Sequence, residues 1–291
     1  MRILLIFIVF ISFFSACCGT KTVVKNVPKP FTKNELQIEE KNNVADIDST
    51  KAIKENPILP ETEEIIAVDK TTVNKTEISN HSSYNALLYK YVSNEGNVNY
   101  DALKKDDAKS LRDYIVSLGK NLPNESWSKE EKLAFWINAY NALTIDLILR
   151  NYPINSIKDI KDPWDQRLWK FGKKWYNLND IEHQILRKMN EPRIHFAIVC
   201  ASFSCPKLQN EAFTAINLEK QLTSATKEFL NDSKRNQIGA NSIKLSKIFQ
   251  WFAKDFKQDG SLIVFLNLYS DIKISPNAKK RFMDYNWNLN E

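Results

Sequence analysis

The chain has 291 residues, 43% of them hydrophobic, and a formal net charge of +6. This length is enough for a domain with a substantial core. Lysines and arginines alternate with acidic residues, which favours a solvated basic surface over attraction to anionic lipid headgroups or an acidic polymer. No nucleic-acid-binding motif accompanies the charge, so we expect no nucleic acid partner.

The N-terminal residues have the pattern of a secretory signal. Arg2 precedes an apolar run over residues 3–14, followed by Ser-Ala and then Cys17. The run is shorter than the roughly twenty residues that a membrane-spanning helix needs, so it predicts a cleaved signal over residues 1–16. Ser-Ala-Cys resembles a lipobox, whose cysteine is acylated with fatty acids such as palmitate. We expect a bacterial-type exported lipoprotein, anchored through Cys17 to the outer or inner membrane of the cell envelope. The alternative is an ordinary signal cut near residue 16 or 19.

Residues 17–80 are predicted to be the acylated N-terminus and a disordered tether. From residue 21 onward this stretch has no glycine, one aromatic residue and four prolines. Its apolar residues are scattered, with neither a helical nor an alternating period. Such a segment buries too little surface to offset the cost of ordering its backbone. We expect it to separate the membrane from a globular domain over residues 81–291.

Helices dominate the first half of this domain. Apolar spacing predicts helices over residues 84–91 and 101–118, with an extended piece at 96–100 between them. Ser128, followed three residues later by Glu131, has the capping-box pattern that opens a helix.

The helix after Ser128, which ends near Arg150, is apolar almost all round, as is typical of a helix buried inside a domain. It carries Asn138 and Asn141 on one face. Buried amides need hydrogen-bond partners. The favoured interpretation is that they bind neighbouring backbone; the alternative is that they form the polar floor of a ligand-binding pocket.

The remaining elements mix short strands with helices. Residues 169–175 predict a hairpin with its turn at Gly172, and residues 178–183 begin a helix with Asn179 or Asp180 as N-cap. The other predicted elements are a buried strand at 194–199, helices at 206–208 and 218–231, a strand at 243–246, and helices at 249–256 and 262–268. Strands placed irregularly among more numerous helices predict a mostly helical α+β single domain with a small sheet.

Four segments together resemble a known family. They are residues 134–143 (AFWINAYNAL), 178–187 (LNDIEHQILR), 193–206 (RIHFAIVCASFSCP) and 285–290 (YNWNLN). In this order they resemble the DUF547 family, a domain of unknown function, over residues 84 to 290. The resemblance implies no particular activity.

Two cysteines of the predicted domain admit several chemistries. Cys200 and Cys205 can form a disulfide, which an exported protein favours. Alternatively, Cys205 is a catalytic nucleophile with His183 or His195 as base, and Glu182 or Asn141 orients that base. The third alternative is two unpaired thiols. On the predicted strand, His195 and Cys200 point to opposite faces. Close cysteine pairs typical of zinc sites are absent, so we expect no metal and no cofactor.

Two further side chains, Arg187 and Trp164, are candidates for ligand contacts. Glu182 and His183 diverge by about 100° on an α-helix, so we do not expect both in one small site. Arg187 shares a face with His183 and can bind a carboxylate, and Trp164 can stack on a sugar or aryl ligand.

A weaker resemblance concerns the order of elements. The apolar helix followed by a hairpin is similar to the core of transglutaminase-like and papain-like cysteine hydrolases, but no cysteine stands in this helix. We expect a domain that binds a ligand or an envelope protein or polymer. The alternatives are a hydrolase or transferase that uses Cys205, and a non-catalytic envelope scaffold.

Overall fold

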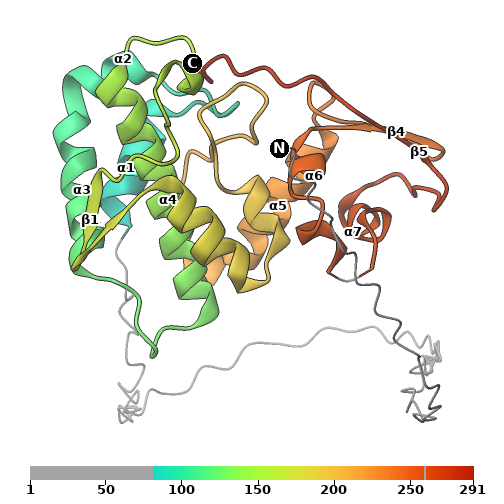
Figure 1. Ribbon diagram of the computed structural model, residues 1–291, viewed down its shortest axis with the longest axis horizontal. Helices are drawn as coiled ribbons and strands as arrows, with labels where there is room; N and C mark the ends of the chain where they lie inside the picture. The colour runs from blue at the N-terminus through green and yellow to red at the C-terminus, as the bar shows by residue number, and fades with distance from the viewer. Residues whose placement is uncertain (1–80, 259) are drawn as a thin grey trace, which may run out of the picture. The chain divides into compact units, whose positions relative to one another are not determined.

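The structure, a computed structural model, describes residues 81–258 and 260–291 (Figure 1). The predicted signal, lipid-bearing Cys17 and tether lie outside these residues. Within the described part of the chain, no helix has both the length and the apolar character needed to cross a bilayer.

Helix α4, Lys129–Asn151, runs through the larger hydrophobic core (Figure 1). Every side chain from Leu133 to Leu149 is buried, as the apolar sequence predicted. At its start the Ser128 hydroxyl accepts a hydrogen bond from the Glu131 backbone N–H at 3.1 Å, and the Glu131 carboxylate accepts one from the Ser128 N–H at 2.6 Å. The capping box is therefore confirmed, and it fixes where the buried helix begins.

Two helices cover α4 on one side. Helix α1, Ser82–Tyr91, packs against α3, Ala108–Lys120, which in turn packs against α4. A short helix α2, Tyr100–Ala102, and a π-helical turn, Leu103–Asp107, lead directly into α3. The helix predicted over residues 101–118 is thus present, with a π-helical irregularity near its start.

The predicted hairpin is confirmed. Strands β1, Trp169–Phe171, and β2, Lys174–Tyr176, pair antiparallel. Gly172 at the turn has φ +58°, a left-handed conformation that favours glycine. The hairpin lies close to the end of α3, where a Cβ on Gly119 would stand 2.9 Å from the Lys170 carbonyl oxygen. Glycine therefore permits the close approach of helix and hairpin.

The segment after the hairpin is helical in irregular turns. Asn179, one of the two predicted caps, directly precedes the π-helix, but its side chain makes no capping bond. That bond comes from Asn177, whose side-chain oxygen accepts from the Asp180 N–H at 2.7 Å. A π-helix, Asp180–Ile185, is followed by a 3₁₀ helix, Leu186–Met189.

The predicted strand at 194–199 is wrong. Pro192–Phe196 is a 3₁₀ helix, and a turn follows it. The run is buried as expected, but Asn141 of α4 takes the place of a neighbouring strand. Its amide donates to the Ala197 carbonyl oxygen at 2.9 Å and accepts from the Val199 N–H at 3.0 Å.

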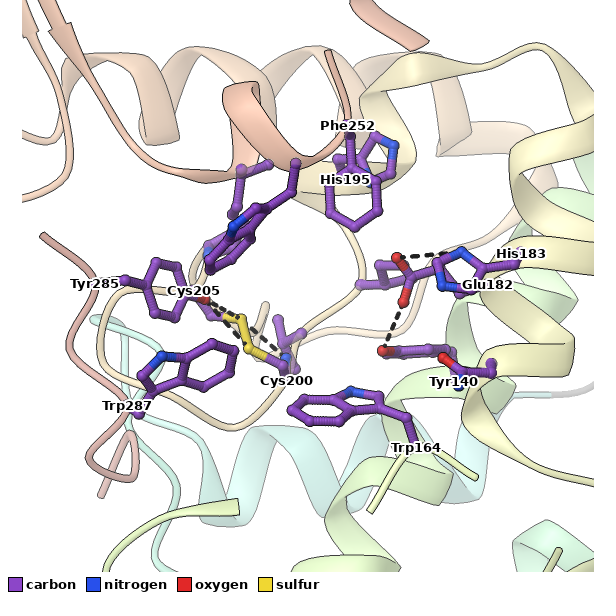
Figure 2. Close-up of a pocket in the computed structure, with 16 residues that line it drawn as sticks. Tyr140, Trp164, Glu182, His183, His195, Cys200, Cys205, Phe252, Tyr285 and Trp287 are labelled. Atoms are coloured by element: carbon purple, nitrogen blue, oxygen red, sulfur yellow. Dashed lines mark hydrogen bonds and ion pairs between the residues drawn. A yellow bond between two sulfur atoms is a disulfide. The ribbon is translucent and has the colours of Figure 1, made fainter. Parts of the chain in front are cut away.

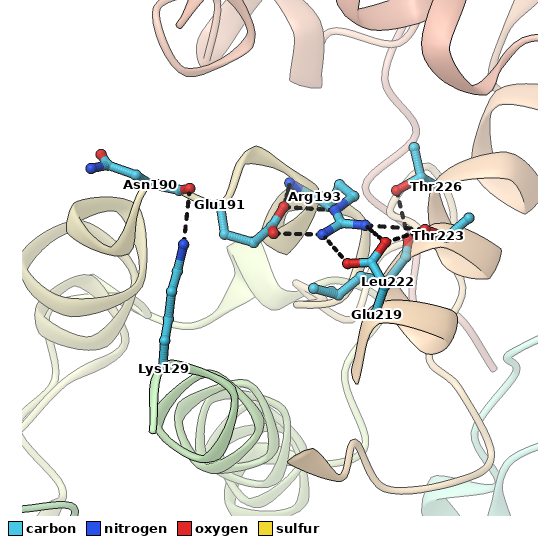
Figure 3. A network of polar contacts seen from close by, with 8 residues as sticks. All are labelled: Lys129, Asn190, Glu191, Arg193, Glu219, Leu222, Thr223 and Thr226. Atoms are coloured by element: carbon cyan, nitrogen blue, oxygen red, sulfur yellow. Dashed lines mark hydrogen bonds and ion pairs between the residues drawn. The ribbon is translucent and has the colours of Figure 1, made fainter. Parts of the chain in front are cut away.

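Arg193 fixes the same 3₁₀ helix to its surroundings (Figure 3). Its guanidinium donates to the carboxylate of Glu191 at 2.7 Å and to that of Glu219 at 2.6 Å. Glu219 belongs to helix α5, Leu218–Asn231, whose predicted bounds are confirmed. These bonds attach the 3₁₀ helix to α5.

The C-terminal part contains a three-stranded sheet, two short helices and a second hydrophobic cluster. Its elements are β3 (Gln237–Ile238), β4 (Ser242–Leu245), α6 (Ile248–Trp251), a 3₁₀ turn (Asp255–Lys257), α7 (Leu262–Tyr269) and β5 (Lys279–Phe282). Two other 3₁₀ turns, Ile157–Asp159 and Ala215–Asn217, lie earlier in the chain. Strand β4 pairs antiparallel with β3 and parallel with β5. The helix predicted at 249–256 divides into α6 and a 3₁₀ turn, and residues 206–208 are not helical. The mostly helical α+β class is confirmed.

The last residues return to the first hydrophobic core. Leu289 forms a bridge with Ser202, and the Asn290 side chain accepts from the Tyr100 hydroxyl at 2.8 Å and donates to the Gly96 carbonyl oxygen at 3.0 Å. These contacts bring the aromatic residues that precede Leu289 beside residues near the middle of the chain.

Candidate ligand pocket

A pocket of about 180 Å³ is lined by both hydrophobic clusters (Figure 2). Val199 contributes from the first cluster and Ile248 from the second. The walls are mainly aromatic: Tyr140, Trp164, Trp251, Phe252, Tyr285 and Trp287. Such a concave, largely apolar surface with few polar groups is the usual form of a small-molecule site.

Three aromatic residues from the C-terminal part form one wall. The ring centroids of Trp251 and Tyr285 are 4.8 Å apart, and those of Tyr285 and Trp287 are 4.6 Å apart. Trp164 also lines the pocket and meets Trp287 edge to face at 5.9 Å, and its predicted contact with a ligand stays a prediction. The rings support one another and so keep their faces in position.

Glu182 supplies the carboxyl group of the pocket. It is 7% exposed, and the Tyr140 hydroxyl donates to it at 3.0 Å. Burial raises the pKa of Glu182 to about 7, although the bond from Tyr140 and the charge of Arg187 oppose the rise. No lysine or arginine side chain of the described residues pairs with this carboxylate.

His183 lies beside Glu182, with its Nδ1 4.0 Å from a Glu182 oxygen. Both side chains line the pocket, so the expectation that they would not share one small site was wrong. They stand on a π-helix, not on the α-helix which that expectation assumed. Burial and the charge of Arg187 lower the pKa of His183. Glu182 and His183 thus place two ionisable groups side by side in the pocket.

The side chains of Arg187 and His195 both contact the carboxylate of Asp255 in the same chain. Arg187 donates two hydrogen bonds to Asp255, at 2.6 and 2.9 Å, and the His195 Nε2 lies 2.8 Å from an Asp255 oxygen. Burial raises the pKa of Asp255, but these bonds outweigh it and hold that pKa well below its usual range. Arg187 thus binds a carboxylate of the protein itself, and its predicted contact with a ligand stays a prediction.

His195 is buried, and its ring stacks on Phe252 with centroids 4.0 Å apart. Burial lowers the pKa of His195 against the opposing effect of Asp255. The ring contributes a flat surface to the pocket, and its Nε2 is directed to Asp255.

Cys200 and Cys205 form a disulfide, with their Cα atoms 6.3 Å apart. The Tyr285 hydroxyl lies 3.3 Å from each sulfur. The predicted role of Cys205 as a nucleophile is incompatible with this bond, because a disulfide sulfur carries no thiolate. The bridge closes a short loop at one side of the pocket.

Asn138 and Asn141, the predicted polar floor of a pocket, are not among the residues that line this one. The Asn138 amide donates to the Phe213 carbonyl oxygen at 2.7 Å and accepts from the Phe213 N–H at 2.9 Å. Asn141 binds backbone in the same two-sided way. Both side chains follow the favoured interpretation, in which buried amides satisfy distant backbone groups.

Sequence reasoning missed Trp251 as a site residue and gave Tyr285 and Trp287 no role in the site. Their one signal was the aromatic Tyr-Asn-Trp segment near the C-terminus. Across the described ranges, no group of three or more histidine, cysteine, aspartate or glutamate side chains is placed to hold a metal ion.

Residues 124–230 match the sequence model of a family described as "Protein of unknown function, DUF547". The match supports the DUF547 resemblance, and it includes α4, the hairpin, α5 and the pocket residues from Tyr140 to Pro206. The C-terminal aromatic wall lies outside the matched segment. Searches of curated proteins and of solved structures gave no match.

Proposed function

We propose that the domain binds a compact, mostly apolar ligand in the aromatic pocket. The observation that carries the proposal is a concave wall of tryptophan and tyrosine rings around one buried carboxyl group, Glu182. An apolar cavity of about 150 Å³ is known to hold benzene in another protein. A pocket of about 180 Å³ has room for a ligand of that size.

Benzyl alcohol is a suitable probe, added to the full chain and followed by saturation-transfer NMR. Trp164→Ala removes one aromatic wall, so we expect it to weaken binding at least several-fold. Trp175→Ala is the matched control, because Trp175 is exposed on the hairpin and does not line the pocket. Equal binding by both variants, or no binding to the natural chain, would contradict the proposal.

We further propose that the chain is an exported lipoprotein held in the cell envelope through Cys17. The signal pattern and the Ser-Ala-Cys sequence support this, and the ligand or partner is then expected in the envelope. Acyl chains on Cys17 would hold the protein on the membrane. Cys17→Ser should release the protein into the soluble fraction, whereas Cys18→Ser should leave it bound. Membrane retention of the Cys17→Ser variant would refute the anchor.

A further inference from the structure

We infer that the ligand of the aromatic pocket is an organic cation, a quaternary or alkylated ammonium group that is held between the tryptophan faces and the Glu182 carboxylate. This inference rests on the proposed binding function and specifies its ligand class. It follows from the charge, the wall chemistry and the hydrogen-bonding capacity of the pocket.

The first argument is charge. Among the described residues that line the pocket, Glu182 is the one carboxylic acid, and no lysine or arginine lines it. Nearby Arg187 is paired with Asp255 through two hydrogen bonds. Glu182 has only the Tyr140 hydroxyl and the neighbouring His183 ring for partners. A buried carboxylate without a cationic partner is costly, and a bound cation would supply that partner.

The second argument is the wall. Trp164, Trp251 and Trp287 line the pocket together with Tyr285. The face of an indole ring carries negative charge density and attracts ammonium groups, most strongly where water is excluded. In Figure 2 the labelled tryptophans Trp164 and Trp287 lie on one side of the pocket and the Glu182 carboxylate on another. A cation between them can contact ring faces and a carboxylate at once.

The third argument is that other ligands would be poorly satisfied. A sugar needs many hydrogen-bond partners, but three polar side chains of the pocket already have partners within the protein. The Tyr140 hydroxyl binds Glu182, the Tyr285 hydroxyl contacts Ser202 at 3.1 Å, and the Asn179 amide binds Asp165 at 2.6 Å. A trimethylammonium group has no hydrogen-bond donors or acceptors, so it loses no hydrogen bonds to water when it enters this pocket.

The test compares choline with 3,3-dimethyl-1-butanol, its neutral carbon analogue of the same shape, by titration calorimetry on the full chain at pH 8. We expect choline to bind about tenfold more tightly or better. Glu182→Gln should remove most of this preference and leave binding of the neutral analogue unchanged. Asp113→Asn, which alters an exposed acid on α3, is the control and should retain the preference.

A second variant covers the case in which Glu182→Gln does not fold. Trp251 is 46% exposed, so Trp251→Leu should fold and should weaken choline more than the neutral analogue. Equal affinity for the two compounds in the natural chain would overturn the inference. If benzyl alcohol binds but choline does not, the ligand class is wrong and the binding function stands. If none of the three compounds binds, the proposed function itself fails.

Discussion

Glu182 stands in an environment that opposes its ionisation. Its carboxyl group is buried in an aromatic wall and receives one hydrogen bond, from Tyr140. Burial removes water from the carboxylate, and the single bond restores only part of the lost solvation. The nearby charges of Arg187 and Asp255 act in opposite directions on its pKa. Folding is therefore coupled to the protonation of this one side chain.

This coupling predicts how stability depends on pH. The pKa of Glu182 rises from 4.5 to about 7 on folding, so between these values the folded protein keeps a proton that the unfolded chain has lost. Its contribution to stability is present below pH 4.5 and is lost as the pH rises through 7. In the Glu182→Gln variant the side chain does not ionise, so this stability is not lost as the pH rises. The free energy of unfolding of this variant, minus that of the natural chain, should therefore rise by up to about 3 kcal/mol from pH 4.5 to pH 8.

Urea unfolding of both proteins at pH 4.5, 6 and 8 measures the difference. The other titrating groups, including His183, His195 and Asp255, remain in both proteins and should largely cancel. Parallel pH profiles would show that Glu182 ionises as freely in the folded protein as in the unfolded chain.

At the scale of elements, the sequence predicted best those segments whose backbone groups form hydrogen bonds within the same segment. Helices α4 and α5 were predicted with nearly correct bounds because their backbone groups pair within each helix. The apolar run at 194–199 was assigned to a strand because burial alone does not distinguish a strand from irregular structure. Its backbone forms hydrogen bonds with the side chain of Asn141, more than fifty residues away, and no local sequence pattern predicts such a partner.

Asn141 should therefore be important for stability. Asn141→Ala leaves the Ala197 carbonyl and the Val199 N–H buried without this partner. We expect a loss of about 3 kcal/mol in the free energy of unfolding. Asn217→Ala is the control, since Asn217 is exposed and binds only Thr214 through its side chain, and it should cost less than about 0.5 kcal/mol. Similar values for the two variants would contradict this role.

At the scale of the whole molecule, the site is assembled from distant parts of the chain. Glu182, His183, His195 and Trp164 were predicted as candidates, and the structure brings them to one pocket. Trp251 and Trp287 could not be predicted there, because their position depends on the packing of the second cluster and on the return of the C-terminal segment. Sequence reasoning thus found pocket residues between Trp164 and Cys205 but not the aromatic wall from the C-terminal part.

The packing of the C-terminal segment against the first core also predicts which part of the chain is needed for folding. The first core includes α1 and α3 before the family segment and Leu289 after it. A fragment of residues 124–230 would expose much of α4, so we expect it to lack cooperative unfolding. Residues 81–291 should unfold with the same midpoint as the full chain. Thermal unfolding followed by circular dichroism tests both expectations, and a cooperative transition in the shorter fragment would contradict the first.

Because the cavity borders two separately packed cores, its width depends on how those cores meet. Phe196 illustrates the point, since its ring packs in the second cluster while its neighbours Ile194 and Ala197 belong to the first. A change of side-chain volume along this boundary would alter the opening without replacing any residue that lines the cavity. Related chains could in this way acquire different selectivity while keeping the same carboxyl group and the same indole rings.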